Sequence, residues 1–166
     1  ARHGAPRAVD DGRHDGHAAA HRRDEGADVE SLQADMFVER APPPQQALLE
    51  IERNGPPPDK VDIVLIGDGY TAAECAAKFR PDAERMAMAL FSHEPFKSRR
   101  ADFNVWGLCP PAAESGVSRP STGIHRRTPV GAAYDAFGSE RYVLTFDNRA
   151  LRDVAAWAPY EFLTIL

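Results

Sequence analysis

The sequence predicts an α/β fold, and three observations support it. Residues 61–66 form a nearly continuous β-branched and aliphatic run of strand length, which suits a strand covered on both faces. A glycine-containing turn and a helix-start signal follow this run directly. Two later apolar runs, at residues 103–109 and 160–166, have the same strand character. Together they predict a sheet with helices on both faces.

The residues before Lys60 differ in composition from those after it. Acidic residues outnumber basic ones by 12 to 7 before Lys60 and equal them, 13 to 13, from Lys60 onward, so the net charge of -5 belongs to the leading part. Residues 1–45 carry few large apolar side chains, and we expect a low-complexity, disordered segment. Proline triplets predict a Pro-rich linker over residues 46–59. An incomplete α/β domain is expected over residues 60–166.

A turn and a capped helix follow the first predicted strand. Thr71 stands three residues before Glu74, which predicts a capping box at the helix start. Pro81 lies inside this helix, where it removes a backbone hydrogen bond and clashes with a carbonyl, so we expect a kink or two abutting helices. Apolar spacing predicts that the helix ends near residues 93–95 and buries Ala76, Phe79, Ala83, Met86, Ala87 and Leu90.

Beyond the predicted strand at residues 103–109, the sequence predicts two more strands and one helix. A long irregular stretch runs to about Gly138, and such stretches often line clefts in α/β domains. Residues 142–146 predict a short strand. Asp147 or Asn148 then caps a helix that Pro159 closes, with Leu151, Val154, Ala155 and Ala158 on one face. Residues 160–166 predict a final strand without a following turn signal, so we expect the natural protein to continue.

Charge and motif spacing argue against several classes of function. The domain is electrically neutral and lacks clustered Lys and Arg, which argues against a nucleic-acid partner. It contains no apolar run of 18 residues, so no membrane span is expected. The Gly67-Asp68-Gly69 turn lacks the additional residues of nucleotide-binding loops, and no Gly-x-Ser-x-Gly elbow is present.

Histidines and cysteines do not assemble a metal site in the sequence. His93-Glu94 does not extend to His-Glu-x-x-His, because residue 97 is Lys and Pro95 would break the helix that presents the pair. His14, His17 and His21 fall in an Arg/Asp-rich tract and are interpreted as compositional. Cys75 and Cys109 leave one disulfide or two free thiols as open alternatives.

Residues 61–71 resemble the opening strand and turn of the IgA-peptidase family of zinc metallopeptidases. Similar blocks follow in the same order over roughly residues 55–166: Phe91 with Glu94-Pro95-Phe96, then residues 103–105, 114–116, 138–142 and 147–151. The resemblance implies a zincin-like catalytic domain that is truncated before its zinc-binding helix. It therefore implies zinc in the full-length protein, but no metal ligand and no catalytic residue in this chain.

The resemblance also implies a place for several side chains. Asp68 follows the buried strand, where α/β folds contact ligands, although Asp in such a turn often only accepts bonds from neighbouring N–H groups. Asp68, Tyr70, Glu114 and Ser115 are the candidates for the substrate cleft.

The resulting hypothesis is a fragment of a secreted or cell-envelope zinc endopeptidase that acts on a protein or peptide substrate. Such enzymes hydrolyse peptide bonds with metal-activated water, and the chain alone is expected to be inactive. We expect no signal peptide within this sequence. The alternative hypothesis is a truncated, non-catalytic protein-binding module.

Overall fold

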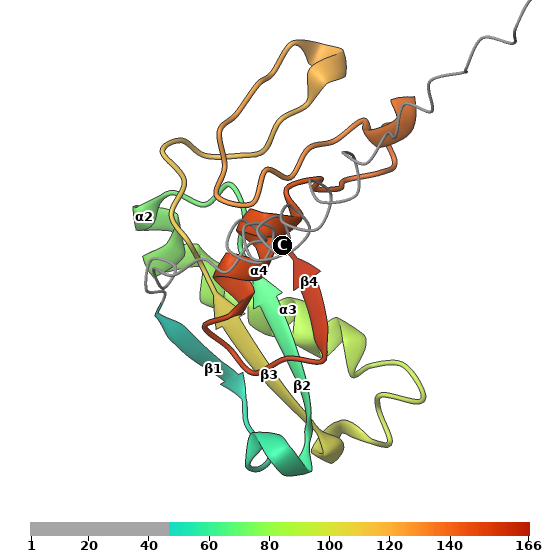
Figure 1. The fold of residues 1–166 in the computed structure, drawn as a ribbon. Helices are drawn as coiled ribbons and strands as arrows, with labels where there is room; N and C mark the ends of the chain where they lie inside the picture. The colour runs from blue at the N-terminus through green and yellow to red at the C-terminus, as the bar shows by residue number, and fades with distance from the viewer. Residues whose placement is uncertain (1–46) are drawn as a thin grey trace, which may run out of the picture. The chain divides into compact units, whose positions relative to one another are not determined.

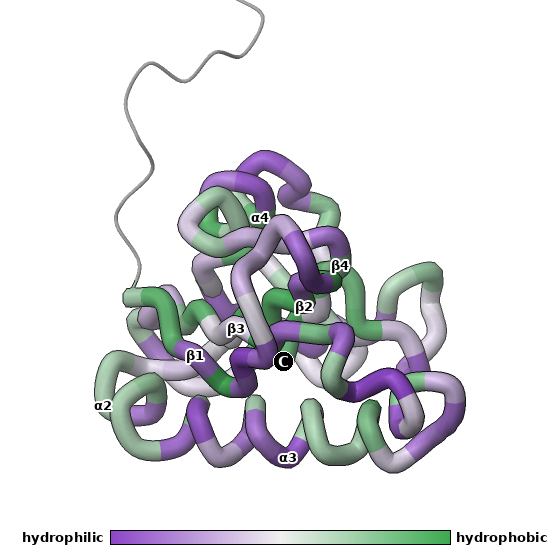
Figure 2. Tube along the Cα trace, turned by 90° about the horizontal axis from the view of Figure 1, so that it is seen from below, coloured by the Kyte–Doolittle hydropathy of each residue, from purple (hydrophilic) through white to green (hydrophobic). Residues whose placement is uncertain are grey.

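The computed structural model describes residues 47–166, which form a four-stranded sheet with helices on both faces. The strand order is β1-β3-β2-β4. Strands β2 (Val61–Ile66), β3 (Phe103–Leu108) and β4 (Phe162–Ile165) are parallel, and β1 (Leu48–Glu52) is antiparallel to β3. Helix α3 (Arg80–Leu90) covers one face and helix α4 (Asn148–Ala155) the other (Figure 2). The predicted α/β fold is confirmed, and the segment expected to be disordered, residues 1–45, lies outside the described residues.

Strand β2 is buried on both faces, as its apolar sequence predicts. Alternate side chains of a strand point to opposite faces, so each half of this run enters a different core. The core on the α3 face contains Ile63, Leu65, Phe79, Ala83, Ala87, Phe91 and Val105. The core on the α4 face contains Val64, Ile66, Trp106, Leu108, Val130 and Ala155.

Asp62 is a buried carboxylate within this apolar strand. It accepts hydrogen bonds from Asn104 Nδ2 at 2.9 Å and from Trp106 Nε1 at 2.6 Å, both in β3. Asn104 Oδ1 in turn accepts the Asn54 N–H at 2.8 Å, just after β1. The network links β2, β3 and the segment after β1. It also satisfies the Asp62 carboxylate, because a buried carboxylate is tolerated only with such partners.

The first helical segment runs from Ala72 to Leu90 in three parts: α2 (Ala72–Glu74), the π-helical turn η2 (Cys75–Phe79) and α3. Thr71 and Glu74 form both halves of the predicted capping box. Pro81 lies in the first turn of α3, directly after the π turn, so two helical segments abut there as Pro81 predicts.

The predicted buried face of this helix is partly wrong. Phe79, Ala83 and Ala87 are buried, whereas Ala76 and Met86 are exposed. A π turn contains more residues than an α turn and therefore rotates the positions on its two sides relative to a regular 3.6-residue pattern. The rotation accounts for the exposure of Ala76, which lies in the π turn, but not for that of Met86, which lies beyond it in α3. The helix also ends at Leu90, before the predicted residues 93–95.

Part of the expected Pro-rich linker is a strand instead. Leu48–Glu52 forms β1 at one edge of the sheet, with Leu49 opposite Gly107, and Pro57–Asp59 forms the short 3-10 helix η1. Leu49 and Ile51 pack against the core on the α3 face. Burial of these two side chains and pairing with β3 stabilise the strand, while the prolines of residues 56–58 stay outside it.

Three predictions concern the end of the chain. Residues 142–146 do not form the predicted strand; only Leu144 makes a bridge, to Ala133. Asp147 caps α4 as predicted, but the helix ends at Ala155, so Ala158 lies beyond it. Strand β4 falls within the run at residues 160–166 and lies next to β2 at the other edge of the sheet.

The carboxyl ends of the three parallel strands point in one direction, and long loops lie beyond them (Figure 1). These loops contain the 3-10 helices η4 (Pro120–Thr122) and η5 (Ala136–Gly138); a third, η3 (Arg100–Asp102), precedes β3. Cys75 and Cys109 form a disulfide that joins η2 to the end of β3, with Cα atoms 5.7 Å apart. None of the helices in residues 47–166 has the length and apolarity needed to cross a bilayer.

Candidate functional site

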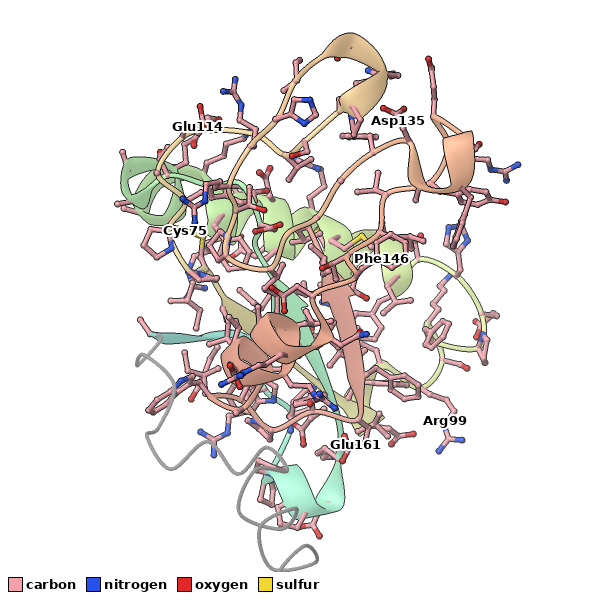
Figure 3. The ribbon with its side chains drawn as sticks, turned by 45° about the horizontal axis from the view of Figure 1, so that its top comes forward. Cys75, Arg99, Glu114, Asp135, Phe146 and Glu161 are labelled. Atoms are coloured by element: carbon pink, nitrogen blue, oxygen red, sulfur yellow. A yellow bond between two sulfur atoms is a disulfide. The ribbon has the colours of Figure 1, made fainter. Side chains whose placement is uncertain are left out.

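A cavity of about 410 Å³ opens beyond the carboxyl ends of the parallel strands. Its walls come from the turn after β2, the first helical segment, residues 115–117, the loops between residues 132 and 144, and the end of β4. Three of the four predicted cleft residues, Asp68, Tyr70 and Ser115, line it together. Glu114 does not line the cavity; it pairs with Arg126 at the outer margin of the loops (Figure 3).

The two glycines of the turn are required by close contacts. A side chain on Gly67 would place its Cβ 2.9 Å from the Phe79 ring and 3.1 Å from Cys109 Sγ. Gly69 has a φ of +76°, which favours glycine, and a Cβ there would lie 2.6 Å from the carbonyl oxygen of Gly116. The Gly116 N–H donates to the Gly69 carbonyl at 2.7 Å. The turn and the loop after β3 therefore touch through their backbones.

Asp68 fixes the loop at residues 128–132, which contributes Ala132 to the wall of the cavity. Its side chain is buried and accepts three hydrogen bonds: from Thr128 Oγ1 at 2.7 Å, from the Val130 N–H at 3.2 Å and from the Ala132 N–H at 2.8 Å. Its own N–H donates to the Leu166 carbonyl at 3.0 Å. A carboxylate that accepts this many donors is a fixed anchor. Asp68 therefore holds residues 128–132 against the end of the sheet.

Tyr70 connects the turn to helix α3. Its hydroxyl donates to Asp82 Oδ2 at 2.9 Å, and Asp82 also pairs with Arg85 at 2.8 Å. Burial, together with the hydrogen bond to Asp82, raises the pKa of Tyr70 to about 12. The hydrogen bond from Tyr70 lowers the pKa of Asp82. The Tyr70 ring packs edge-on against Phe79, with Lys78 Nζ 5.6 Å from its centroid.

Ser115 is held by the carboxylate of the capping box. Ser115 Oγ donates to Glu74 Oε1 at 2.8 Å, and Glu74 Oε2 accepts from both the N–H and the hydroxyl of Thr71 at 2.9 Å. These donors, the Thr71 N–H first, lower the pKa of Glu74. A carboxylate is also favoured at a helix N-terminus by the dipole. The arrangement fixes the loop after β3 to the start of the helical segment.

The described residues do not fit a zinc centre. No group of three or more His, Cys, Asp or Glu side chains within residues 47–166 is placed to hold a metal ion, whereas a zinc site needs three or four ligands. Asp68 and Glu74, the carboxylates that line the cavity, are engaged by N–H and O–H donors. Both cysteines are in the disulfide. Within residues 47–166 the cavity therefore offers no set of ligands for a zinc ion.

Several cavity residues were not predicted as site residues from the sequence. Glu74 was identified only as a helix cap, although a carboxylate close to the end of a buried strand was a usable signal. Lys78 gave no signal beyond its place in a helix. Tyr134, Val143 and Leu144 form one wall; Tyr134 comes from the long irregular stretch, and Val143 and Leu144 come from residues that were predicted as a strand and not as a site. Long-range pairing between Ala133 and Leu144, which brings these segments together, leaves no local trace in the sequence.

Comparison with known proteins assigns the same part of the chain to one family. The family model described as IgA Peptidase M64 matches residues 49–166, from within β1 to the end of the sheet. No curated protein matches the chain significantly. The matched residues are more than half of the chain, and they extend the resemblance seen over residues 55–166 to include β1. The chain belongs to the IgA peptidase M64 family.

Proposed function

We propose that the chain is the amino-terminal part of the catalytic domain of a zinc-dependent endopeptidase and supplies one side of its substrate cleft. The family match over residues 49–166 is the observation that carries the peptidase assignment. The zinc is an expectation from the family, and its ligands are proposed to lie outside the described residues, which form no such ligand set. When bound, the ion would polarise the scissile carbonyl and activate water. We propose no metal ligand and no catalytic residue among the described residues.

The contribution of this chain to the enzyme is to bind and orient the substrate. The cavity lies at the carboxyl ends of parallel strands, where ligands bind in open α/β sheets. Its volume falls within the range of small-ligand sites, and its walls combine apolar side chains with the backbone of Gly69 and Gly116. These properties support binding of one or two side chains of a polypeptide. Ser115 and Tyr70, both held by carboxylates, would keep the cavity in shape.

A protease assay on the product of the extended gene tests this function. We expect cleavage of casein that is abolished by 1,10-phenanthroline and restored by Zn²⁺, together with a His-Glu-x-x-His helix downstream of residue 166. The matched control replaces the Glu of that motif with Gln, which should leave folding intact and remove activity. An extended product without the motif, or activity that persists in the chelator, would contradict the proposal.

We also propose that the protein functions outside the cytoplasm, in the secreted or envelope fraction. The Cys75–Cys109 disulfide supports this location, because disulfides persist in oxidising compartments and are rare in reducing ones. The measurement is mass spectrometry of protein alkylated at the moment of cell lysis. An unmodified, linked pair of peptides is expected; complete alkylation of both cysteines would argue for a cytoplasmic protein.

A further inference from the structure

Residues 133–146 form an irregular hairpin, here named the aromatic hairpin. Its base is closed by two hydrogen bonds, from the Ala133 N–H to the Leu144 carbonyl at 2.9 Å and from the Leu144 N–H to the Ala133 carbonyl at 3.0 Å. Among the described residues, Phe137 and Phe146 are the most exposed large apolar side chains, at 80% and 71%. The exposed large apolar side chains of the hairpin are Tyr134, Phe137, Tyr142, Val143, Leu144 and Phe146.

The backbone of the hairpin is in an unfavourable conformation at its tip. Asp135 and Phe137, with φ of 63° and 56°, are the non-glycine residues with positive φ in residues 47–166. This conformation costs roughly 1–2 kcal/mol for an L-residue and is unusual for a bulky aromatic. Phe137 offsets little of the cost by burial, and its main aromatic contact is an edge-on pair with Phe146 at 6.0 Å. Strained residues that gain no packing are typical of functional sites.

Contacts with neighbouring loops hold the hairpin in this conformation. Asp135 Oδ2 accepts the Ser121 N–H at 2.9 Å, and the Tyr134 N–H donates to the Ser118 carbonyl at 2.8 Å. Thr145 Oγ1 donates to the Val130 carbonyl at the other end. Figure 3 shows Asp135 beside the short helix η5 and Phe146 on the irregular returning segment of the hairpin. A surface held in this way loses less entropy when it binds a partner.

The hairpin also contributes side chains to the wall of the cavity. Tyr134, Val143 and Leu144 line the cavity, while Phe137 and Phe146 lie further along the same segment. A polypeptide with one side chain in the cavity can therefore extend along the hairpin to the aromatic pair. An extended polypeptide has this reach, since successive residues are about 3.3 Å apart.

Charge on the hairpin indicates which polypeptides would fit. Arg119 pairs with Glu140 at 3.3 Å, so the charge of this glutamate is compensated. Arg141, the next residue, is exposed and makes no ion pair with another described residue. Arg141 directly precedes the exposed Tyr142 in the chain, and a cation at this position favours a partner that combines apolar side chains with a carboxylate.

We propose that the aromatic hairpin is a docking site for an extended polypeptide segment that carries aromatic or aliphatic side chains next to a carboxylate. Its role in capturing a protein substrate beside the cavity rests on the proposed peptidase function. The docking itself does not require catalysis, so it is measurable on this chain alone.

The test is fluorescence anisotropy of the 166-residue chain with a short labelled peptide that contains two Phe and two Asp in a Gly-Ser background. Phe137→Ser and Phe146→Ser should each weaken binding about fivefold or more, as loss of an aromatic contact usually does. Met88→Ser is the matched control, because Met88 is 58% exposed on α3, away from the hairpin, and should keep the wild-type affinity. Thermal melts of all variants show that each is folded.

Reversing the charge of Arg141 tests whether the bound segment carries a carboxylate. Arg141→Glu should weaken binding of the Asp-containing peptide and strengthen binding of a matched peptide with Lys in place of Asp. Equal binding of both peptides by Arg141→Glu and by the wild type would overturn the assigned role of the carboxylate.

Other results would overturn the docking site itself. One is a loss of peptide affinity in the Met88→Ser control that equals the loss in the Phe variants. Another is the absence of peptide binding by the wild type, combined with cosedimentation with phosphatidylcholine–phosphatidylglycerol vesicles that the two Phe variants abolish. A concentration-dependent dimer that Phe137→Ser dissociates, without peptide binding, would assign the surface to a second copy of the chain. Peptide binding that follows the predicted pattern, with no chelator-sensitive activity in the extended product, would contradict the proposed function alone.

Discussion

The turn at residues 67–71 and the aromatic hairpin border the same cavity but use their residues in opposite ways. Every residue of the turn is fixed by a contact inside the chain: Gly67 and Gly69 by close packing, Asp68 by three donors, Tyr70 by Asp82 and Thr71 by the helix it caps. The hairpin instead holds Phe137 and Phe146 in solvent. The turn is architectural, whereas the surface proposed for docking lies in the hairpin, although residues 138–142 of the hairpin resemble the family as well.

This difference has a thermodynamic signature. Substitutions in the turn should destabilise the fold in proportion to the contacts they remove. Substitutions at the tip of the hairpin should leave the fold unchanged or stabilise it, because the tip has an unfavourable backbone and little buried area. Measurements of stability along the cavity therefore test the comparison directly.

Gly69→Ala should have the largest effect. The new Cβ would lie 2.6 Å from the Gly116 carbonyl oxygen, and the φ of +76° is unfavourable for alanine. The strain and the clash together should lower the free energy of unfolding by about 3 kcal/mol. Urea denaturation followed by circular dichroism measures this change.

Gly123→Ala is the matched control for this substitution. Gly123 has a similar φ of +73°, but nothing lies within 4 Å of the position of its Cβ. It should therefore show only the backbone strain, about 1 kcal/mol. Equal effects at the two sites would show that contact between the turn and the Gly116 loop contributes nothing.

Asp68→Asn should have the next largest effect. The amide keeps one acceptor oxygen but directs an NH₂ group toward N–H donors that the carboxylate now satisfies. We expect a loss of about 2 kcal/mol, since hydrogen bonds to a charged group are the stronger ones. Hydrogen exchange of the Val130 and Ala132 amides should accelerate more than that of strand β2.

Asp153→Asn serves as the control for the loss of a carboxylate. Asp153 is on the exposed side of α4 and pairs with Arg149 at 3.9 Å. A surface pair of this kind contributes less than about 0.5 kcal/mol. If Asp68→Asn were equally mild, the anchor role of Asp68 would be excluded.

Tyr70→Phe should have an intermediate effect with a distinct dependence on pH. Loss of the hydrogen bond to Asp82, which remains paired with Arg85, should cost about 1.5 kcal/mol at neutral pH. Because the pKa of Tyr70 is raised to about 12 in the folded protein, its contribution is complete below pH 10 and is lost as the pH rises toward 12. The wild type should thus lose stability over this window more steeply than the variant.

The same substitution should act at acidic pH. The pKa of Asp82 is lowered by the Tyr70 hydroxyl, so the stability it contributes is present above its ordinary value of 3.8 and is lost as the pH falls below it. Tyr70→Phe should reduce this acid-dependent loss. Tyr160→Phe, which removes an exposed hydroxyl without a hydrogen bond to a described residue, should change stability at pH 7 by less than about 0.5 kcal/mol. Parallel pH profiles for Tyr70→Phe and the wild type would exclude the coupling.

Local chemistry explains which parts of the fold were predictable. Strand β2 was predicted because its apolar residues fill two cores, and the helix start because Thr71 and Glu74 are only three residues apart. Strand β1 was not predicted, because its partner in β3 lies far along the chain and two proline triplets flank it in the sequence. The partners of Asp62, more than 40 residues away in β3, were invisible for the same reason.

The cavity was predictable at the turn that directly follows β2 and, from the resemblance to the family, at Ser115. Asp68 and Tyr70 come directly after β2, and the end of a buried strand is a position that sequence can identify. The opposite wall depends on nonlocal backbone contacts, such as the bonds between Ala133 and Leu144. This wall had only partial signals in the sequence: residues 138–142 resemble a family block and residues 142–146 were predicted as a strand, but the pairing of Ala133 with Leu144 follows no periodic pattern.

Phe137→Asn should have the smallest effect on stability and the opposite sign. Asparagine adopts positive φ more readily than phenylalanine, and the 80% exposed ring gives up little buried area. The free energy of unfolding should rise by about 0.5 kcal/mol, a fraction of the cost of the left-handed conformation, while affinity for the peptide falls. Phe146→Asn lacks the positive φ and should bring no such gain. A destabilised Phe137→Asn variant would mean that the ring serves the fold, and the contrast between the turn and the hairpin would fail.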